Sequence, residues 1–133
     1  MDKLIGLSLF FTLVSSSAIM EDLAIVRICN ATDSVDISIL NDYMLNHDFN
    51  TLENHQLRQL SCFLLCIYSE YNWMDHHGSF KIHNIKSWMH RAKLPTDHIE
   101  ILLKRCITSE LTDPCTRARH FTECFWSNHQ VKL

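Results

Sequence analysis

The clearest periodic pattern of apolar positions along the chain follows Pro95. These positions stand three and four residues apart and therefore share one face of a helix: Ile99, Leu102, Leu103, Cys106 and Ile107. Asp97 and Glu100 have the spacing of a capping box, in which two side chains satisfy the first free backbone N–H groups of a helix. The pattern predicts an amphipathic helix that carries one cysteine toward the core.

Two further helices are predicted in the middle of the chain. From about Leu52 to Tyr71 an apolar stripe follows one face, while Cys62 and Cys66 stand one turn apart on a neighbouring side. The segment 75–78 has the composition of a turn, after which Ser79 is expected to cap the next helix. That helix presents a second apolar stripe, made of Ile82, Ile85, Trp88 and Met89.

The last helix is predicted from its N-terminal signals. Asp113 has the position of an N-cap, and Pro114 that of the first helical residue. The following residues place one cysteine, one small residue and two aromatic rings on the same side: Cys115, Ala118, Phe121 and Phe125. The inner face of this helix therefore holds large aromatic side chains.

The start of the chain after residue 18 is less regular. Val35, Ile37 and Ile39 alternate as in a strand, whereas Ile39, Leu40, Tyr43 and Met44 recur at helical spacing, and a helix is favoured. Residues 20–30 are expected to form a short first helix. The sequence has 2 glycines and 2 prolines, a supply of turn residues that favours long helices with few loops. The predicted fold class is all-α, with about six helices.

The N-terminus has the order of features found in secretory signal peptides. Lys3 precedes an apolar run from Leu4 to Val14, and small residues follow as far as Ala18. The alternative is a membrane anchor, but this run is too short to cross about 30 Å of hydrocarbon as a helix. Residues 1–18 are therefore predicted to be a signal peptide, and residues 19–133 a single secreted domain.

Charge and cysteine content narrow the function further. The net charge of −3 argues against nucleic acid or an anionic membrane as the main partner, because both select basic surfaces. In an oxidising compartment the 6 cysteines are expected to form disulfides, whose pairing the spacing alone leaves open. A zinc site is the competing interpretation, but paired C-x-x-C units are absent from the sequence and no metal is predicted. Asn30-Ala31-Thr32 is a glycosylation sequon beside Cys29, and its use is left open.

The cysteine spacing resembles that of the insect odorant-binding proteins, the family of pheromone-binding and general odorant-binding members. Between successive cysteines lie 32, 3, 39, 8 and 8 residues. The local sequences 62–68 (CFLLCIY), 73–75 (WMD), 113–115 (DPC) and 124–125 (CF) are similar to that family as well. The resemblance covers about residues 20–126.

The resemblance implies an interlocked disulfide pairing and a function. The implied bridges are Cys29–Cys66, Cys62–Cys115 and Cys106–Cys124. Helices held by covalent links tolerate an internal apolar cavity, which in an unbridged domain would cost on the order of 24 cal/mol per Å³. The family uses such a cavity to carry small hydrophobic molecules, so this chain is expected to be a secreted carrier of odorants, pheromones or other lipophiles, without a cofactor.

The ligand-binding residues are predicted from helix faces together with the pocket-lining positions of the family. The apolar members of this set are Phe49, Leu64, Trp73, Met74, Ile85, Trp88, Met89, Leu103, Phe121 and Phe125. Each is also a reasonable ordinary core residue. Tyr68 and Ser69 are the predicted hydroxyl groups that orient a ligand. The tail from Phe125 to Leu133 is expected to form a lid strand.

Further expectations concern release, partners and competing functions. The 9 histidines suggest ligand release on acidification, with His76, His77, His83 and His129 as the residues to test. A chemoreceptor and a second copy of the chain are further candidate partners. A secreted enzyme is disfavoured because the sequence has no His-Glu-x-x-His, Gly-x-Ser-x-Gly or Cys-Cys-x-x-His-Asp motif. The main alternative is a helical signalling or toxin protein that acts through its surface and has a filled core.

Overall fold

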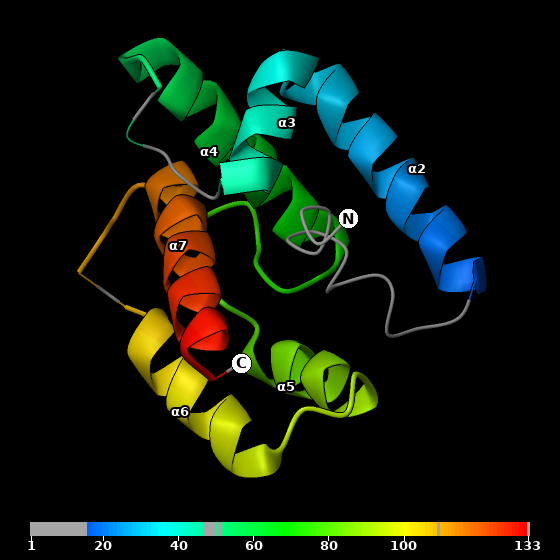
Figure 1. The fold of residues 1–133 in the computed structure, drawn as a ribbon, viewed down its shortest axis with the longest axis vertical. Helices are drawn as coiled ribbons and strands as arrows, with labels where there is room; N and C mark the ends of the chain where they lie inside the picture. Colours follow the sequence, from blue (N-terminus) through cyan, green and yellow to red (C-terminus); the bar gives the residue numbers. More distant parts are fainter. Residues whose placement is uncertain (1–15, 47–49, 51, 109, 133) are drawn as a thin grey trace.

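The structure is a computed structural model that describes residues 16–46, 50, 52–108 and 110–132. In this part of the chain the regular structure is helical, and no strand is formed (Figure 1). The helices are α2 (Ser16–Thr32), α3 (Ile37–Asn46), α4 (Asn54–Glu70), α5 (Ile82–Arg91), α6 (Thr96–Cys106) and α7 (Pro114–Lys132). The prediction of an all-α domain with six helices is confirmed.

Helix α4 is central to the packing. It contacts α2 on one side and α7 on another, α7 also contacts α6, and α6 contacts α5 (Figure 1). The apolar stripe predicted for α4 faces inward, because Leu60, Leu64 and Ile67 are all buried. The core therefore lies between α4 and α7 and is closed by α5 and α6.

The three disulfides tie these helices together in the pairing that the family resemblance implied. Cys29–Cys66 joins α2 to α4, Cys62–Cys115 joins α4 to α7, and Cys106–Cys124 joins α6 to α7. Neighbouring cysteines on α4 thus reach two different helices, and no cysteine is left free.

The turn between α4 and α5 rests on the beginning of α7. Gly78 has φ of +88°, and a Cβ atom built on it would lie 2.9 Å from the Cα of Pro114. Arg117 donates a hydrogen bond to the Gly78 carbonyl at 3.0 Å. Asp75 accepts hydrogen bonds from the backbone N–H groups of His77 and Ser79, which closes the turn. The predicted turn at residues 75–78 is confirmed, and the contact with α7 explains why a glycine stands there.

Two predicted helix caps are wrong, although α6 begins directly after Pro95 as predicted. Ser79 does not cap α5, because the helix begins only at Ile82 with Lys81 as its N-cap. The capping box of Asp97 and Glu100 does not form either. Helix α6 begins at Thr96 with Pro95 as N-cap, so Asp97 is the second helical residue and cannot act as the cap.

The predicted lid strand is also wrong. Helix α7 continues through the tail to Lys132. No proline or glycine follows Pro114, so nothing in the sequence stops the helix at Phe125. The last helix does start as predicted, since Asp113 accepts a hydrogen bond from the Thr116 N–H at 2.8 Å.

At the N-terminal end, α2 begins at Ser16 and extends beyond the expected 20–30 in both directions. It crosses the predicted signal-peptide boundary between Ala18 and Ile19, so that boundary stays a prediction. Within the described residues, no helix combines the length and the apolar composition needed to cross a bilayer.

Candidate functional site

Aromatic rings gather where the C-terminal end of α4, the loop after it, α5 and α7 meet. Trp73 stacks on Tyr68 with ring centroids 5.6 Å apart and meets Trp88 edge-on at 5.4 Å. Phe121 lies edge-on to Tyr68 at 5.5 Å and is 6.3 Å from Phe125. We call these five residues the aromatic cluster. Four of them are buried and Trp88 is half-buried.

The loop after α4 places Trp73 in this cluster. Asn72 has φ of +64°, which reverses the chain directly after the helix. The Trp73 N–H then donates to the Tyr68 carbonyl at 2.8 Å, and its own carbonyl accepts from the Lys81 N–H at 2.7 Å. The indole is therefore fixed between the end of α4 and the start of α5.

The hydroxyl of Tyr68 is bonded inside the cluster. It lies 2.6 Å from Oγ1 of Thr122, and that hydroxyl donates its own proton to the Ala118 carbonyl at 2.8 Å. Tyr68 is therefore the donor in the pair. Burial raises the pKa of Tyr68 well above its usual value, and the hydrogen bond to Thr122 lowers it by less. The group stays a neutral phenol whose proton already has a protein acceptor.

Aliphatic and sulfur side chains surround the rings. Leu64, Met74, Ile85, Met89 and Leu103 are each at most 5% exposed and belong to the same core. Met side chains adapt their shape to neighbouring groups, so Met74 and Met89 can fill irregular spaces beside the rings. The structure therefore brings together all the predicted ligand residues except Phe49 and Ser69.

These two exceptions have different causes. Phe49 lies outside the described residues. Ser69 faces another side of α4, where it lines a pocket of about 320 Å³ together with Ile28 of α2, Leu65 and the disulfide cysteines. Its position directly after Tyr68 turns it away from the aromatic cluster, because adjacent residues on a helix point in directions about 100° apart. Ser69 therefore does not lie beside the aromatic cluster, and its role as a ligand residue stays a prediction.

Sequence reasoning missed two members of the site. Thr122 is 2% exposed and accepts the proton of Tyr68, and Phe80 lies 5.3 Å from Phe121 between ring centroids. Thr122 could have been found, since it stands four residues after Ala118 and three before Phe125 on the predicted inner face. Phe80 gave no signal, because it stands in the loop and reaches the core through its pairing with Met74.

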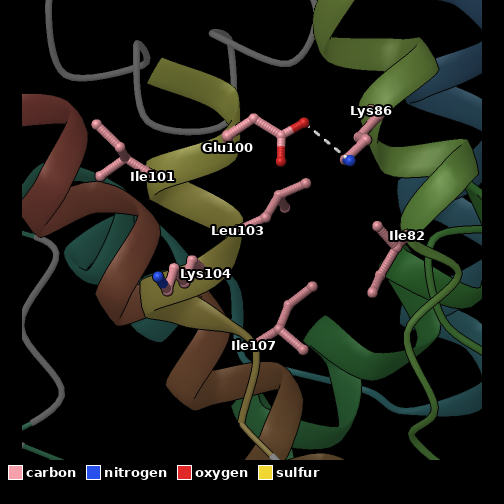
Figure 2. A pocket seen from close by; sticks show the side chains of 7 residues that line it. All are labelled: Ile82, Lys86, Glu100, Ile101, Leu103, Lys104 and Ile107. Carbon is pink, nitrogen blue, oxygen red and sulfur yellow. Dashed lines mark ion pairs between the residues drawn. The ribbon is translucent and has the colours of Figure 1, made fainter. Parts of the chain in front are cut away.

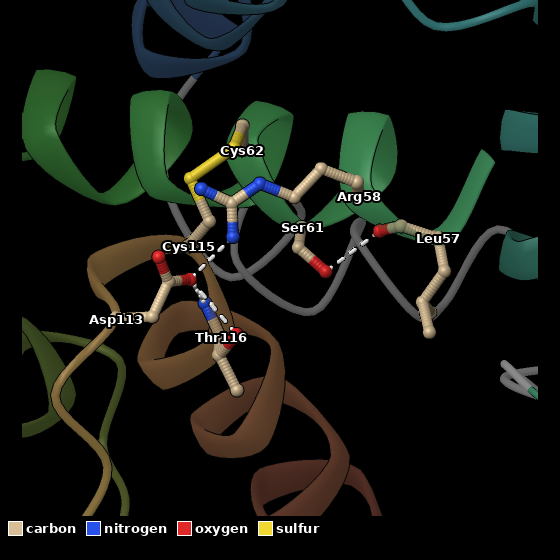
Figure 3. Close-up of polar contacts among 7 residues, drawn as sticks. All are labelled: Leu57, Arg58, Ser61, Cys62, Asp113, Cys115 and Thr116. Atoms are coloured by element: carbon tan, nitrogen blue, oxygen red, sulfur yellow. Dashed lines mark hydrogen bonds and ion pairs between the residues drawn. A yellow bond between two sulfur atoms is a disulfide. The ribbon is translucent and has the colours of Figure 1, made fainter. Parts of the chain in front are cut away.

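A solvent-exposed ion pair joins α4 to the start of α7. Arg58 of α4 pairs with Asp113 at the start of α7, beside the Cys62–Cys115 disulfide (Figure 3). Both side chains are more than a third exposed.

In the part of the chain that the structure describes, no three His, Cys, Asp or Glu side chains are grouped so that they could hold a metal ion.

Comparison with known proteins gives the family. No curated protein and no solved structure matches the chain significantly. A sequence model of the PBP/GOBP family matches residues 24–128, which include all the described parts of α3 to α6 and most of α7. That family consists of proteins that bind small hydrophobic molecules and not of enzymes. With six cysteines in three bridges, six helices and a family match over most of its length, this chain belongs to the PBP/GOBP family of odorant-binding proteins.

Proposed function

We propose that this protein is a secreted carrier that binds a small apolar ligand against the aromatic cluster and moves it through an aqueous extracellular fluid. The observation that carries the proposal is the meeting of Tyr68, Trp73, Trp88, Phe121 and Phe125 in one place, with thioethers and aliphatic groups around them. Such a surface gains free energy by burying apolar ligand area, at roughly 25 cal/mol per Å².

The disulfides support the same proposal. They join α2, α4, α6 and α7 by covalent bonds, so the domain does not depend on complete filling of its centre to stay folded. A ligand that displaces or inserts between core side chains then costs less than in an unbridged domain of similar size. An internal apolar cavity remains part of the proposal.

The polar chemistry of the site favours a ligand with few hydrogen-bonding atoms. The Tyr68 proton is committed to Thr122, so the phenol can offer a ligand an acceptor but not a donor. Ligands with a carbonyl or ether oxygen as their only polar group are expected to gain nothing specific from Tyr68. Recognition is expected to rest on shape and apolar area.

A fluorescence titration tests the proposal. The oxidised protein is mixed with the apolar probe N-phenyl-1-naphthylamine, and the probe is then displaced by aliphatic and aromatic lipophiles. Trp88→Ala is expected to weaken probe binding about ten-fold, since it removes the half-buried wall of the cluster. Leu57→Ala is the matched control, because Leu57 is a half-buried apolar residue on α4 outside the cluster.

Two results would contradict the proposal. The first is an oxidised, folded protein that neither enhances the probe emission nor releases the probe to any lipophile. The second is equal loss of binding in Trp88→Ala and Leu57→Ala, which would separate binding from the cluster. The first result favours the alternative of a helical signalling or toxin protein that acts through its surface, and the second rejects only the cluster as the binding site.

A further inference from the structure

A second candidate binding site lies outside the aromatic cluster, in a groove between α5 and α6. The groove has a volume of about 500 Å³, within the range of small-molecule sites. Ile82 projects into it from α5, Leu103 projects from α6, and Ile107 projects from the residue that follows α6 (Figure 2). Leu103 is buried, so this groove residue also belongs to the core.

The groove exposes apolar surface that the protein itself does not cover. Ile82 and Ile101 are 45% and 44% exposed, which places both among the exposed large hydrophobic residues of the described chain. Together with Leu103 and Ile107 they provide branched aliphatic side chains and no aromatic ring. This lining matches an extended alkyl chain better than a planar aromatic molecule.

The groove is lined by two positively charged side chains and one negatively charged side chain. Lys86 of α5 and Glu100 of α6 form an ion pair of 2.8 Å across the groove, at the end opposite Ile107 (Figure 2). Lys104 stands one helical turn after Glu100 and also lines the groove. It makes no ion pair within the described residues, so the groove carries one uncompensated positive charge in a chain with a net charge of −3.

We propose that this groove binds a single-chain aliphatic carboxylate, with the alkyl chain against Ile82, Leu103 and Ile107 and the carboxylate beside Lys104. One monoanion balances the one unpaired ammonium group, and a charge-assisted hydrogen bond to a carboxylate is stronger than one between neutral groups. The site is distinct from the aromatic cluster, where the described polar contact is between neutral hydroxyls. The proposal does not depend on the carrier function of that cluster.

Chemical-shift mapping by NMR tests where such a ligand binds. Sodium decanoate and 1-decanol are titrated separately into the oxidised protein, since they share the chain and differ in charge. Decanoate is expected to shift the backbone amides of residues 82–86 and 100–107, and to bind about five-fold more tightly than decanol. Equal affinities for the two ligands, or decanoate shifts confined to the neighbours of Trp73 and Phe121, would overturn the proposal.

Two variants with matched controls test the residues. Lys104→Gln removes the unpaired charge, and Ile82→Gln removes an exposed apolar wall; each is expected to weaken decanoate binding about three- to ten-fold. Lys93→Gln and Ile37→Gln are the controls, because Lys93 is exposed outside the groove and Ile37 is 72% exposed on α3. Unfolding by urea is measured for all four variants, since Lys104 also stands in the last turn of α6, where a cation stabilises the helix.

The outcomes separate this site from the carrier site. If the naphthylamine probe binds the groove variants as it binds the original protein while decanoate binding falls, both proposals stand independently. If decanoate binds Lys104→Gln and Ile82→Gln with unchanged affinity, the groove proposal is rejected and the carrier proposal is unaffected. If decanoate does not bind and the groove variants instead abolish a concentration-dependent dimer, the groove is an interface between two copies and the ligand proposal is rejected.

Discussion

At the scale of single residues, the carboxylate of Asp113 joins two helices. One of its oxygens accepts hydrogen bonds from the backbone N–H and the hydroxyl of Thr116, each at 2.8 Å, and also from Arg58 of α4 (Figure 3). The hydrogen bond from Arg58, aided by those from Thr116, lowers the pKa of Asp113 to about 2 despite the opposing effect of burial. The residue is thus both the N-cap of α7 and a link to α4 next to their disulfide.

Two substitutions separate these roles. Asp113→Asn keeps a side-chain oxygen for the cap and loses the ion pair, so it is expected to cost less than about 1 kcal/mol because the pair is solvent-exposed. Asp113→Ala loses both and is expected to cost about 1 to 2 kcal/mol. Urea unfolding at pH 7 measures both values, and an Asn variant as unstable as the Ala variant would contradict the assigned role of the cap.

The lowered pKa also predicts a dependence on pH. Folding favours the deprotonated form of Asp113, because its pKa is lower in the folded state than in the unfolded state. The contribution of this carboxylate to the free energy of unfolding is therefore present above pH 4 and is lost as the pH falls from about 4 to about 2. The stability difference between the original protein and Asp113→Asn should therefore shrink over that range. A difference that stays constant from pH 6 to pH 2 would show that the pair does not couple to folding.

At the scale of elements, α5 and α6 depend on one covalent link. They pack on each other, α6 packs on α7, and Cys106–Cys124 is the disulfide that joins this pair of helices to the rest of the domain. The other two bridges hold α2, α4 and α7. Because the Cys106–Cys124 bridge spans a separation of only 18 residues, its effect on the unfolded chain is the smallest of the three in a chain-entropy description.

Removal of this bridge is expected to loosen one part of the molecule more than the other. The double variant Cys106→Ala/Cys124→Ala should lose roughly 3 kcal/mol of stability. Backbone amide hydrogen exchange should accelerate more for residues 82–106 than for α2 and α4. The reason is that α2 and α4 keep the Cys29–Cys66 and Cys62–Cys115 bridges. Uniform acceleration over all helices would mean that the domain opens only as a single unit.

At the scale of the whole molecule, the histidines lead to the prediction that acidification releases the ligand. His76, His77 and His83 are exposed and stand around the loop and helix start that hold Trp73 in place, whereas the side chain of His129 is outside the described part. Because these histidines stand around that loop, the prediction of acid-triggered release means that the affinity for the naphthylamine probe falls by a few-fold at pH 5.

A triple variant isolates this effect. His76→Gln, His77→Gln and His83→Gln together should make the affinity for the probe the same at pH 5 and pH 7, while binding at pH 7 remains unchanged. Equal affinity of the original protein at both pH values would reject acid-triggered release. It would leave the carrier function itself untouched.

The sequence by itself determined the fold class, the approximate place of each helix and the family. Helical periodicity survives in the sequence because each helix buries one face, and the positions of Leu60, Leu64, Ile99 and Phe121 show that face directly. The cysteine spacing, through the resemblance that it carries, also indicated the disulfide pairing, which the structure confirms. Most predicted ligand residues meet in one cluster for the same reason, since they stand on the inner faces of α4 to α7 or in the loop that joins α4 to α5.

Only the tertiary structure decided the details that depend on contacts between distant segments. Ser79 is not the cap because α5 begins only at Ile82, and the Tyr68 hydroxyl is bonded to Thr122, 54 residues away in the chain. Ser69 lines the pocket beside α2. Lys104 and Ile82 share the groove between α5 and α6 because these two helices pack against each other. A local pattern specifies which face of a helix is apolar, but the partner of each side chain is set by how the helices come together in space.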